Sequence, residues 1–262
     1  MSNSLPPSGI YPFYDELGAS KEGVTASLYR LVRPVARFLP IPRHTFFPLL
    51  YELYLAGLRL VSWPVPWRYR GRRDLLVNLG AGANGRPGWV NVDIFKAPGV
   101  NCRYDCRKRL PFSDGAVRGI YCEHFFEHLD YTEEVPAFLS DCHRVLRPGG
   151  VLRIAVPDAG RYLEAYNRPG WEDLVRLRPL EPGHVDAHFR FAYRTKMELV
   201  NMVFRQGHHH KYAYDYETVD FVLRRYGFSQ VSRQPYRRSL LPELAIDDPG
   251  RASESLYVDA SK

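Results

Sequence analysis

The chain has 262 residues, of which 45% are hydrophobic and 25% are charged, with a formal net charge of +7 and a pI of about 9.2. This composition is typical of a globular protein and excludes a disordered or low-complexity chain. A chain of this length can bury a sizeable core. Residues 1–73 carry ten basic and four acidic residues, so most of the net charge is local and does not by itself indicate nucleic-acid binding.

Cysteine spacing and apolar stretches bear on the compartment. The four cysteines form no C-x-x-C pair, which predicts a reduced, cytoplasmic protein without a zinc site of the paired-cysteine type. Residues 1–20 lack the basic start and apolar core of a signal peptide. The most apolar stretch, residues 46–67, is interrupted by charged residues and prolines, so no transmembrane span is expected.

The N-terminal region, residues 1–73, predicts a helical appendage. Residues 24–38 place apolar side chains at helical spacing, with arginines on the other side. A second helix is expected to start after Thr45, with Pro48 in its first turn and a thin polar stripe that includes Glu52 and Arg59. A helix so apolar requires burial. We therefore favour the interpretation that the N-terminal helices cap the cofactor and substrate cleft. The alternative is contact of residues 24–63 with an anionic membrane.

Residues 74–158 alternate between strand and helix patterns. Strands are expected at 75–79, 89–94, 117–122 and 151–156. A helix is expected over 132–146, with Pro136 in its first turn. The run Arg147-Pro148-Gly149-Gly150 then predicts a turn into the last of these strands. This alternation indicates a parallel sheet with helices packed on it.

Residues 159–262 begin with an expected helix over 161–166 and a His-rich insertion over about 167–215. A second helix is expected over 217–226, with Asp215 as its N-cap and Gly227 as its stop. Two late strands, 228–236 and 255–260, are joined by a connection long enough for an antiparallel pair at the sheet edge.

A glycine-rich turn, Val77-Asn78-Leu79-Gly80-Ala81-Gly82, ends the first predicted strand. Such a turn lets a nucleotide or similar group approach the backbone closely, although a lone G-x-G is weak evidence. Asp93 ends the second strand, where a carboxylate can accept hydrogen bonds from two ribose hydroxyls. Further along lie Leu110-Pro111-Phe112, the run Glu123 to Leu129 (EHFFEHL) and the run Arg144 to Gly150 (RVLRPGG).

In this order the motifs resemble the class I S-adenosylmethionine-dependent methyltransferases, in particular a predicted small-molecule subgroup with N-L-G-x-G, E-H-x-x-E-H-L and R-V-L-x-P-G-G. The resemblance covers roughly residues 74–262. It implies an α/β fold with a Rossmann-like seven-stranded sheet, helices on both faces, the N-terminal appendage (1–73) and the insertion after the fifth strand. It also implies S-adenosylmethionine as cofactor.

The resemblance assigns cofactor contacts by position. Gly80 and Gly82 would pass under the methionine part, Asp93 would bind the ribose diol, and Asp105 would lie at the adenine edge. The full predicted set is Asn78, Gly80, Ala81, Gly82, Asp93, Ile94, Asp105, Cys106, Glu123 and His124. The gap from Gly82 to Asp93 is short, which predicts that the first crossover helix is clipped or missing.

The histidines allow two interpretations. His124 and His128, beside Glu123 and Glu127, suit either a metal site or a base, or a structural turn in which His128 bonds the backbone. We favour the structural role for His128 and a substrate-side position for His124. The insertion also contains an H-x-D-x-H run, residues 184–188. Because such short matches are common by chance, we favour substrate recognition or general base catalysis there and predict no metal.

The predicted catalytic residues are His124, Asp158 and His210. For Asp158, a helix cap and a substrate-orienting role are equally compatible with the sequence. The predicted substrate-binding residues, some of which have packing as the alternative, are His128, Tyr162, His184, His188, Tyr212 and Tyr214.

The resemblance implies methyl transfer to a small-molecule acceptor in natural-product or polysaccharide-related metabolism, and no RNA-binding pattern in the sequence indicates a nucleic-acid partner. A histidine base favours O-methylation, and N-methylation is the alternative. One rival function is other chemistry of the same cofactor, such as aminopropyl transfer or cyclisation. The other is a non-catalytic binding protein.

Overall fold

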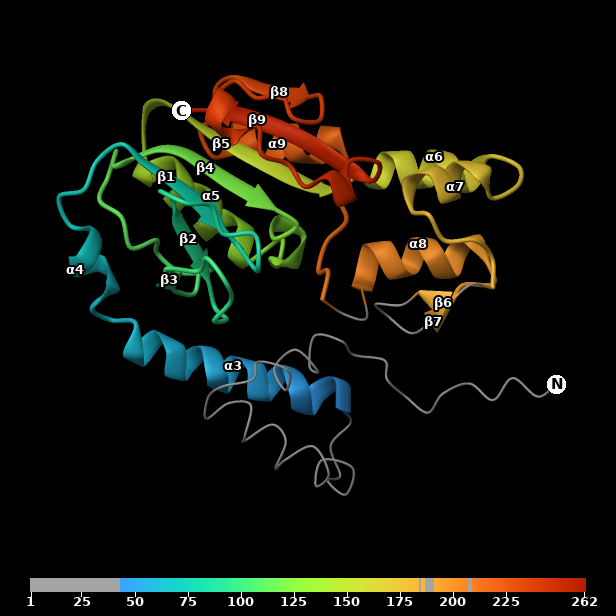
Figure 1. Ribbon diagram of the computed structural model, residues 1–262, viewed down its shortest axis with the longest axis horizontal. Helices are drawn as coiled ribbons and strands as arrows, with labels where there is room; N and C mark the ends of the chain where they lie inside the picture. The colour runs from blue at the N-terminus through green and yellow to red at the C-terminus, as the bar shows by residue number, and fades with distance from the viewer. Residues whose placement is uncertain (1–42, 184, 187–190, 207–208) are drawn as a thin grey trace.

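The computed structural model describes residues 43–183, 185–186, 191–206 and 209–262 (Figure 1). The helix predicted over 24–38 lies outside these residues. No helix in the described ranges combines the length and the apolar character that a bilayer crossing requires.

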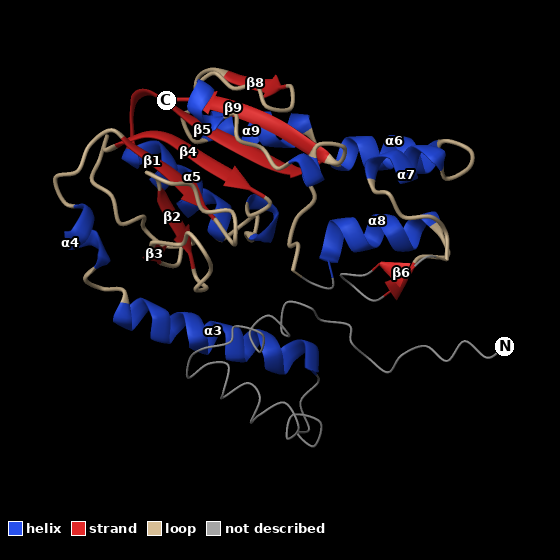
Figure 2. Cartoon of the chain, viewed as in Figure 1, coloured by secondary structure: helices blue, strands red, loops and turns tan. Residues whose placement is uncertain are grey.

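A seven-stranded sheet forms the centre of the molecule, in the order β3-β2-β1-β4-β5-β9-β8 (Figure 2). The first five strands are parallel, and β9 runs antiparallel to both β5 and β8. This order confirms the predicted sheet with its antiparallel edge pair. The strands are β1 (Leu75–Leu79), β2 (Val90–Asp93), β3 (Cys102–Arg103), β4 (Val117–Glu123), β5 (Leu146–Pro157), β8 (Val231–Gln234) and β9 (Ser255–Ser261).

Strand β5 starts earlier than the sequence predicts. Leu146 already pairs with Val117, and the next pair is Gly119 with Val151, so the register shifts between them. The expected turn over 147–150 is therefore an irregularity within the strand, because Pro148 cannot donate to the ladder and Gly149 adopts a φ of 72°. The late strand predicted over 228–236 is shorter, at Val231–Gln234.

Two helices, α5 (Glu134–Val145) and α9 (Tyr216–Arg225), share one apolar core cluster with the sheet. Asp215 caps α9 as predicted, accepting a hydrogen bond from the Thr218 amide at 2.9 Å. Beyond the end of β5 lie α6 (Ala159–Asn167), α7 (Glu172–Leu177) and α8 (Lys196–Arg205) with the short strands β6 (Val185–Asp186) and β7 (Phe191–Ala192) (Figure 1). These elements have a second core cluster of their own.

The opposite face of the sheet has a different cover. Between Leu79 and Val117 the chain contains strands and turns but no helix, which confirms the missing first crossover helix. The face is instead covered by a loop with the 3-10 helix η3 (Pro242–Leu244), whose Leu244 packs on Tyr121 and Val151. Among the described residues, long helices thus cover one face, and on the other face this loop lies where the sequence predicts helices.

Arg153 fixes this loop from the middle of β5. Its guanidinium is fully buried and binds Asp247 of the loop at 2.6 Å and Asp259 of β9 at 2.7 Å, both carboxylates being fully buried. Burial would lower the pKa of Arg153, but the two carboxylates raise it, so the side chain stays charged. Asp247 and Asp259 also accept the backbone amides of Arg237 and Leu240.

The helix α3 (Arg43–Val61) and the short α4 (Val65–Tyr69) precede the sheet, and α3 passes beside β2 and β3 (Figure 1). Burial of its apolar side was expected. Leu55 and Leu58 are buried, but Leu53 and Leu60 are 60% and 76% exposed within the described part of the chain. The thin polar stripe faces the sheet instead, because Arg59 is held by the carboxylate of Asp105.

We predict that Arg153→Met lowers the free energy of unfolding by about 3–5 kcal/mol, since it leaves two buried carboxylates without their cation. Arg176→Met is the matched control, because its ion pair with Asp173 is exposed and such pairs contribute about 0–1 kcal/mol. Urea unfolding of both variants would measure the difference. Equal losses would show that the Arg153 cluster does not hold the loop.

Candidate active site

The glycine-rich turn after β1 approaches the end of β4. Gly80 has a φ of 70°, and a Cβ atom there would lie 2.7 Å from Cβ of Phe125. Only glycine combines this conformation with so close a neighbour. Gly82 has a φ of 48° with open space where a Cβ would project, so the backbone is accessible at that point. Buried Asn78 supports the turn by donating to the Asn84 carbonyl at 3.3 Å.

Asp93 lies next to this turn, at the end of β2. One carboxylate oxygen accepts the Gly82 amide at 2.8 Å and the other accepts the Phe95 amide at 2.9 Å. Burial raises the pKa of this carboxyl group, and the amides partly offset that effect. Because each carboxylate oxygen has two lone pairs, both oxygens can accept a further hydroxyl. The next residue, Ile94, accepts the Tyr54 hydroxyl of α3 at 2.7 Å.

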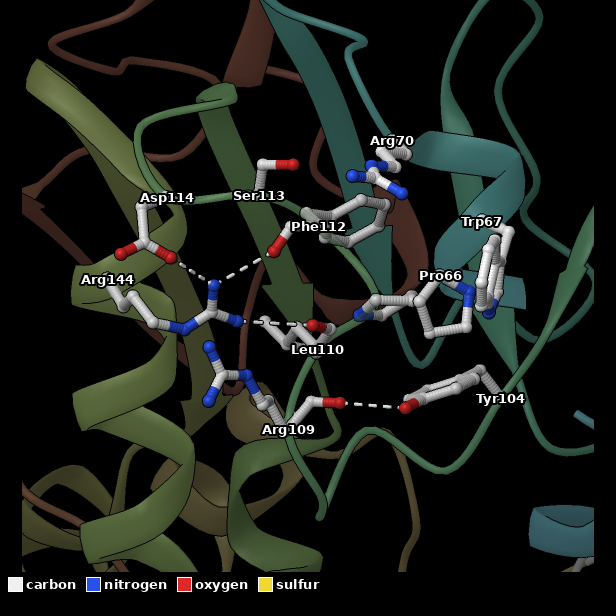
Figure 3. Close-up of a pocket in the computed structure, with 11 residues that line it drawn as sticks. Pro66, Trp67, Arg70, Tyr104, Arg109, Leu110, Phe112, Ser113, Asp114 and Arg144 are labelled. Carbon is white, nitrogen blue, oxygen red and sulfur yellow. Dashed lines mark hydrogen bonds and ion pairs between the residues drawn. The ribbon is translucent and has the colours of Figure 1, made fainter. Parts of the chain in front are cut away.

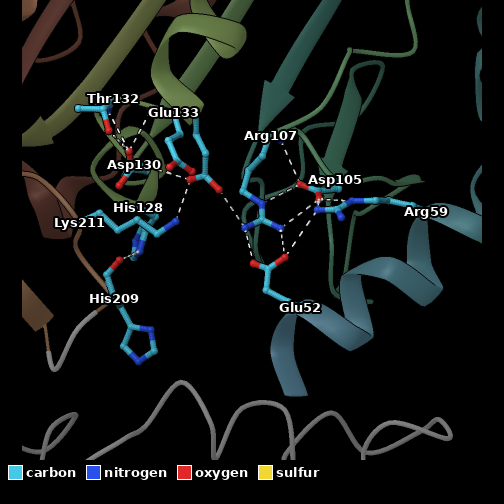
Figure 4. Close-up of polar contacts among 11 residues, drawn as sticks. Glu52, Arg59, Asp105, Arg107, His128, Asp130, Thr132, Glu133, His209 and Lys211 are labelled. Carbon is cyan, nitrogen blue, oxygen red and sulfur yellow. Dashed lines mark hydrogen bonds and ion pairs between the residues drawn. The ribbon is translucent and has the colours of Figure 1, made fainter. Parts of the chain in front are cut away.

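Asp105 forms ion pairs with two arginines, Arg59 and Arg107 (Figure 4). Arg59 of α3 reaches it at 2.6 Å, and Arg107 donates to it from its backbone and its guanidinium. Burial would raise the pKa of Asp105, but Arg107 and Arg59 hold it below its usual value. Its lone pairs are used within the protein, so its predicted contact with adenine would require Arg59 to move. Cys106 is buried, and burial raises the pKa of its thiol.

Glu123 and His124 end β4. Glu123 accepts the Asp248 amide at 3.0 Å, and burial raises its pKa. His124 adopts a φ of 49°, which is strained for a residue with a side chain. Its ring is held on two sides, with Nε2 at 2.9 Å from the Ser255 hydroxyl and Nδ1 at 3.2 Å from Glu127. Sequence reasoning missed Ser255, which comes from a distant strand.

Glu127 and His128 belong to the 3-10 helix η1 (Phe126–His128). His128 donates from Nδ1 to the carbonyl of His209 at 3.0 Å, in line with a structural role for this side chain. His210 donates from Nδ1 to the carbonyl of Val203, and its Nε2 lies 3.8 Å from Glu127. The structure therefore brings the E-H-x-x-E-H motif and the end of the insertion together, which no local pattern indicates.

The other predicted residues have structural partners or lie outside the description. Asp158 caps α6 through the Arg161 amide and pairs with Arg233. Tyr162 is buried and donates to Glu254 at 2.8 Å, so it packs rather than lining a pocket. Tyr212 stacks on Tyr131 with the ring centroids 4.2 Å apart, and buried Tyr214 packs on Phe126. His184 and His188 lie outside the described residues.

A separate pocket of about 470 Å³ opens beside α4 (Figure 3). It is lined by α4 and the segment that leads into β4, and Arg144 spans it to the carbonyls of Leu110 and Phe112. None of the residues predicted to bind cofactor or acceptor lines it. It is not the candidate site, which lies at the carboxyl ends of β1, β2 and β4.

Part of the chain is similar to a known family. Residues 93–154 match a family described as a methyltransferase domain. No curated protein matches the chain in sequence. Among solved structures, the chain is similar to an S-adenosylmethionine-dependent methyltransferase from Archaeoglobus fulgidus, with 19% identity, 82% of this chain and 100% of that chain covered, and a TM-score of 0.42.

The 1,6-didemethyltoxoflavin-N1-methyltransferase from Burkholderia thailandensis is a second similar structure, with 15% identity, 86% and 92% coverage and a TM-score of 0.38. A third is phosphoethanolamine N-methyltransferase 2 from Haemonchus contortus, with 11% identity, 79% and 52% coverage and a TM-score of 0.39. The family match covers about a quarter of the chain, from the end of β2 to within β5. Over that segment the chain is similar to a methyltransferase domain.

Proposed function

We propose that this protein transfers a methyl group from S-adenosylmethionine to an oxygen atom of a small-molecule acceptor. The observation that carries the proposal is the meeting of three strand ends. The Gly82 amide donates to the Asp93 carboxylate, and the Gly80 backbone closely approaches Phe125, the residue after His124. Ligands of open α/β sheets bind where strand order reverses, here between β1 and β4.

The residues present fit the cofactor. The positive-φ glycines leave backbone exposed beside Gly82, and Asp93 has lone pairs to accept the ribose diol. Asn78, Ala81 and Ile94 support this arrangement from the turn and from the end of β2. When bound, S-adenosylmethionine supplies a methyl group on a positively charged sulfur, which a nucleophile can displace.

His124 is the base in this proposal. An acceptor hydroxyl must lose a proton as it attacks, and histidine is the side chain that most often takes such a proton. Nδ1 faces Glu127 at 3.2 Å and Nε2 faces the Ser255 hydroxyl at 2.9 Å, so the orientation of the ring is fixed before the acceptor binds. The proton of the acceptor would pass to Nε2, through the Ser255 hydroxyl or in place of it. The side chain is only 12% exposed, and such a recessed group is accessible to a small molecule rather than to a folded macromolecule. Asp158 and His210 have other partners and take no part.

Asp93→Ala should weaken S-adenosylmethionine binding by roughly tenfold to a hundredfold, because a charge-assisted hydrogen bond contributes about 1.5–3 kcal/mol. Isothermal calorimetry on the full chain measures the change. Asp114→Ala is the control, since that carboxylate is 75% exposed and precedes the start of β4, which pairs with the start of β1 and not with its end at the turn. Unchanged affinity in Asp93→Ala would place the cofactor elsewhere.

The product of turnover separates the rival reactions. Methyl transfer leaves S-adenosylhomocysteine, whereas aminopropyl transfer or cyclisation leaves methylthioadenosine. Mass analysis with a panel of hydroxylated acceptors should show S-adenosylhomocysteine together with an acceptor heavier by one methylene. Methylthioadenosine would refute methyl transfer, and tight cofactor binding without either product would favour a non-catalytic protein.

His124→Gln should lower kcat by about a hundredfold to ten-thousandfold, the usual contribution of a general base, with little effect on cofactor affinity. His143→Gln is the control, because His143 lies on α5 and packs on Phe228. Steady-state assays with the acceptor found above would compare the two variants. A kcat that survives in His124→Gln would show that the acceptor needs no base, as expected for an amine.

A further inference from the structure

Glu127 is a buried carboxylate with few donors around it. Its side chain is only 2% exposed, and among the described residues neither oxygen accepts a hydrogen bond of regular geometry. The His124 ring lies beside it, with Nδ1 3.2 Å from a carboxylate oxygen. The side chain of Lys211, whose amide donates to the Glu127 carbonyl, pairs with Glu134 at 2.8 Å. Burial of a carboxylate with so little compensation is costly, so a further positive charge beside it is expected.

Two histidines adjoin this carboxylate. His210 donates its Nδ1 proton to the Val203 carbonyl, and His128 donates its Nδ1 proton to the His209 carbonyl. A carbonyl only accepts, so both neutral rings carry their lone pair on Nε2. In metal sites, the ligating histidine almost always donates its other ring N–H to a carbonyl or carboxylate. Both rings therefore already have the tautomer and the outer hydrogen bond of a metal ligand.

The geometry leaves the His210 ring facing the carboxylate without a proton between them. Nδ1 of His210 is used by the Val203 carbonyl, and Nε2 lies 3.8 Å from a Glu127 oxygen, too far for a hydrogen bond. The buried Tyr214 hydroxyl, whose ring packs on Phe126, also has no hydrogen-bond partner among the described residues.

We infer that Glu127, His128 and His210 bind a divalent transition-metal ion of the zinc type. One ligand atom from each residue lies within 4.8 Å of the others. A tetrahedral zinc ion holds its ligand atoms roughly 3.3 Å apart, so binding requires a closure of about 1.5 Å at most. Two imidazoles and one carboxylate suit zinc or iron, and three protein ligands leave one coordination position for water.

The backbone holds the ligands in place before metal binding. The amides of Lys211 and Tyr212 donate to the Glu127 carbonyl at 2.8 and 3.3 Å. The end of the insertion is thereby joined to η1, and His210 is kept beside Glu127. This site is distinct from the H-x-D-x-H run of the sequence, from which no metal was predicted, and it does not depend on methyl transfer.

Zinc titration tests the inference directly. The full chain, purified without a polyhistidine tag and stripped with EDTA, is titrated with zinc sulfate against a chromophoric chelator, in the absence of cofactor. We expect one zinc per chain. Glu127→Gln and His210→Gln should each weaken binding by at least about tenfold, whereas the control His143→Gln should bind as the wild type does. No stoichiometric zinc, or unchanged affinity in Glu127→Gln, would overturn the site.

Thermal unfolding supplies a readout that does not depend on affinity. Zinc should raise the unfolding midpoint of the wild type and of His143→Gln but not that of Glu127→Gln. In EDTA, Glu127→Gln should unfold at or above the wild-type midpoint, because it removes an unpaired buried charge. A lower midpoint in EDTA would show that protein donors hold the carboxylate, and the metal site would be refuted. Zinc binding that fails while S-adenosylhomocysteine still forms would leave the proposed methyl transfer intact.

Discussion

Arg153 imposes the constraint on which the site depends. A guanidinium in the middle of a central strand must be paired, and its two partners come from β9 and from the loop of residues 235–248. That loop covers the face of the sheet that lacks crossover helices. Its Asp248 amide in turn holds Glu123 at the end of β4. One buried charge thus connects the cover of the sheet to the residues beside the cofactor turn.

The same logic operates at the other edge of the site. Asp105 is buried, and the arginine that α3 supplies helps to hold it as a carboxylate. At least one basic residue of the segment 1–73, Arg59, therefore has a specific partner in Asp105. Because the Tyr54 hydroxyl also donates to the Ile94 carbonyl, α3 is held beside the ends of β2 and β3.

Elements with strong local patterns could be predicted from the sequence. The apolar runs of β1 and β4 and the Asp215 cap of α9 need no distant partner to be recognised, and their positions match. The orientation of α3 could not be predicted, because hydrophobicity favours burying its apolar side while a single ion pair turns Arg59 inward. The loop over the second face escaped prediction for a related reason. From its local sequence, Arg153 is expected to be an exposed residue of a strand. Its two partners, Asp247 and Asp259, lie about a hundred residues further along the chain.

The site shows the same division between local and distant information. The glycine turn and Asp93 lie within one short stretch of chain, and their contact follows from the spacing of two adjacent parallel strands. The sequence predicts a substrate-side position for His124, but it does not indicate the partner Ser255, which belongs to the last strand. Glu127 is the furthest from sequence reasoning. The rings of His210 and His128 donate their Nδ1 protons in hydrogen bonds to the carbonyls of Val203 and His209. Those two bonds leave lone pairs on the rings, rather than protons, for the carboxylate, and no sequence pattern indicates them.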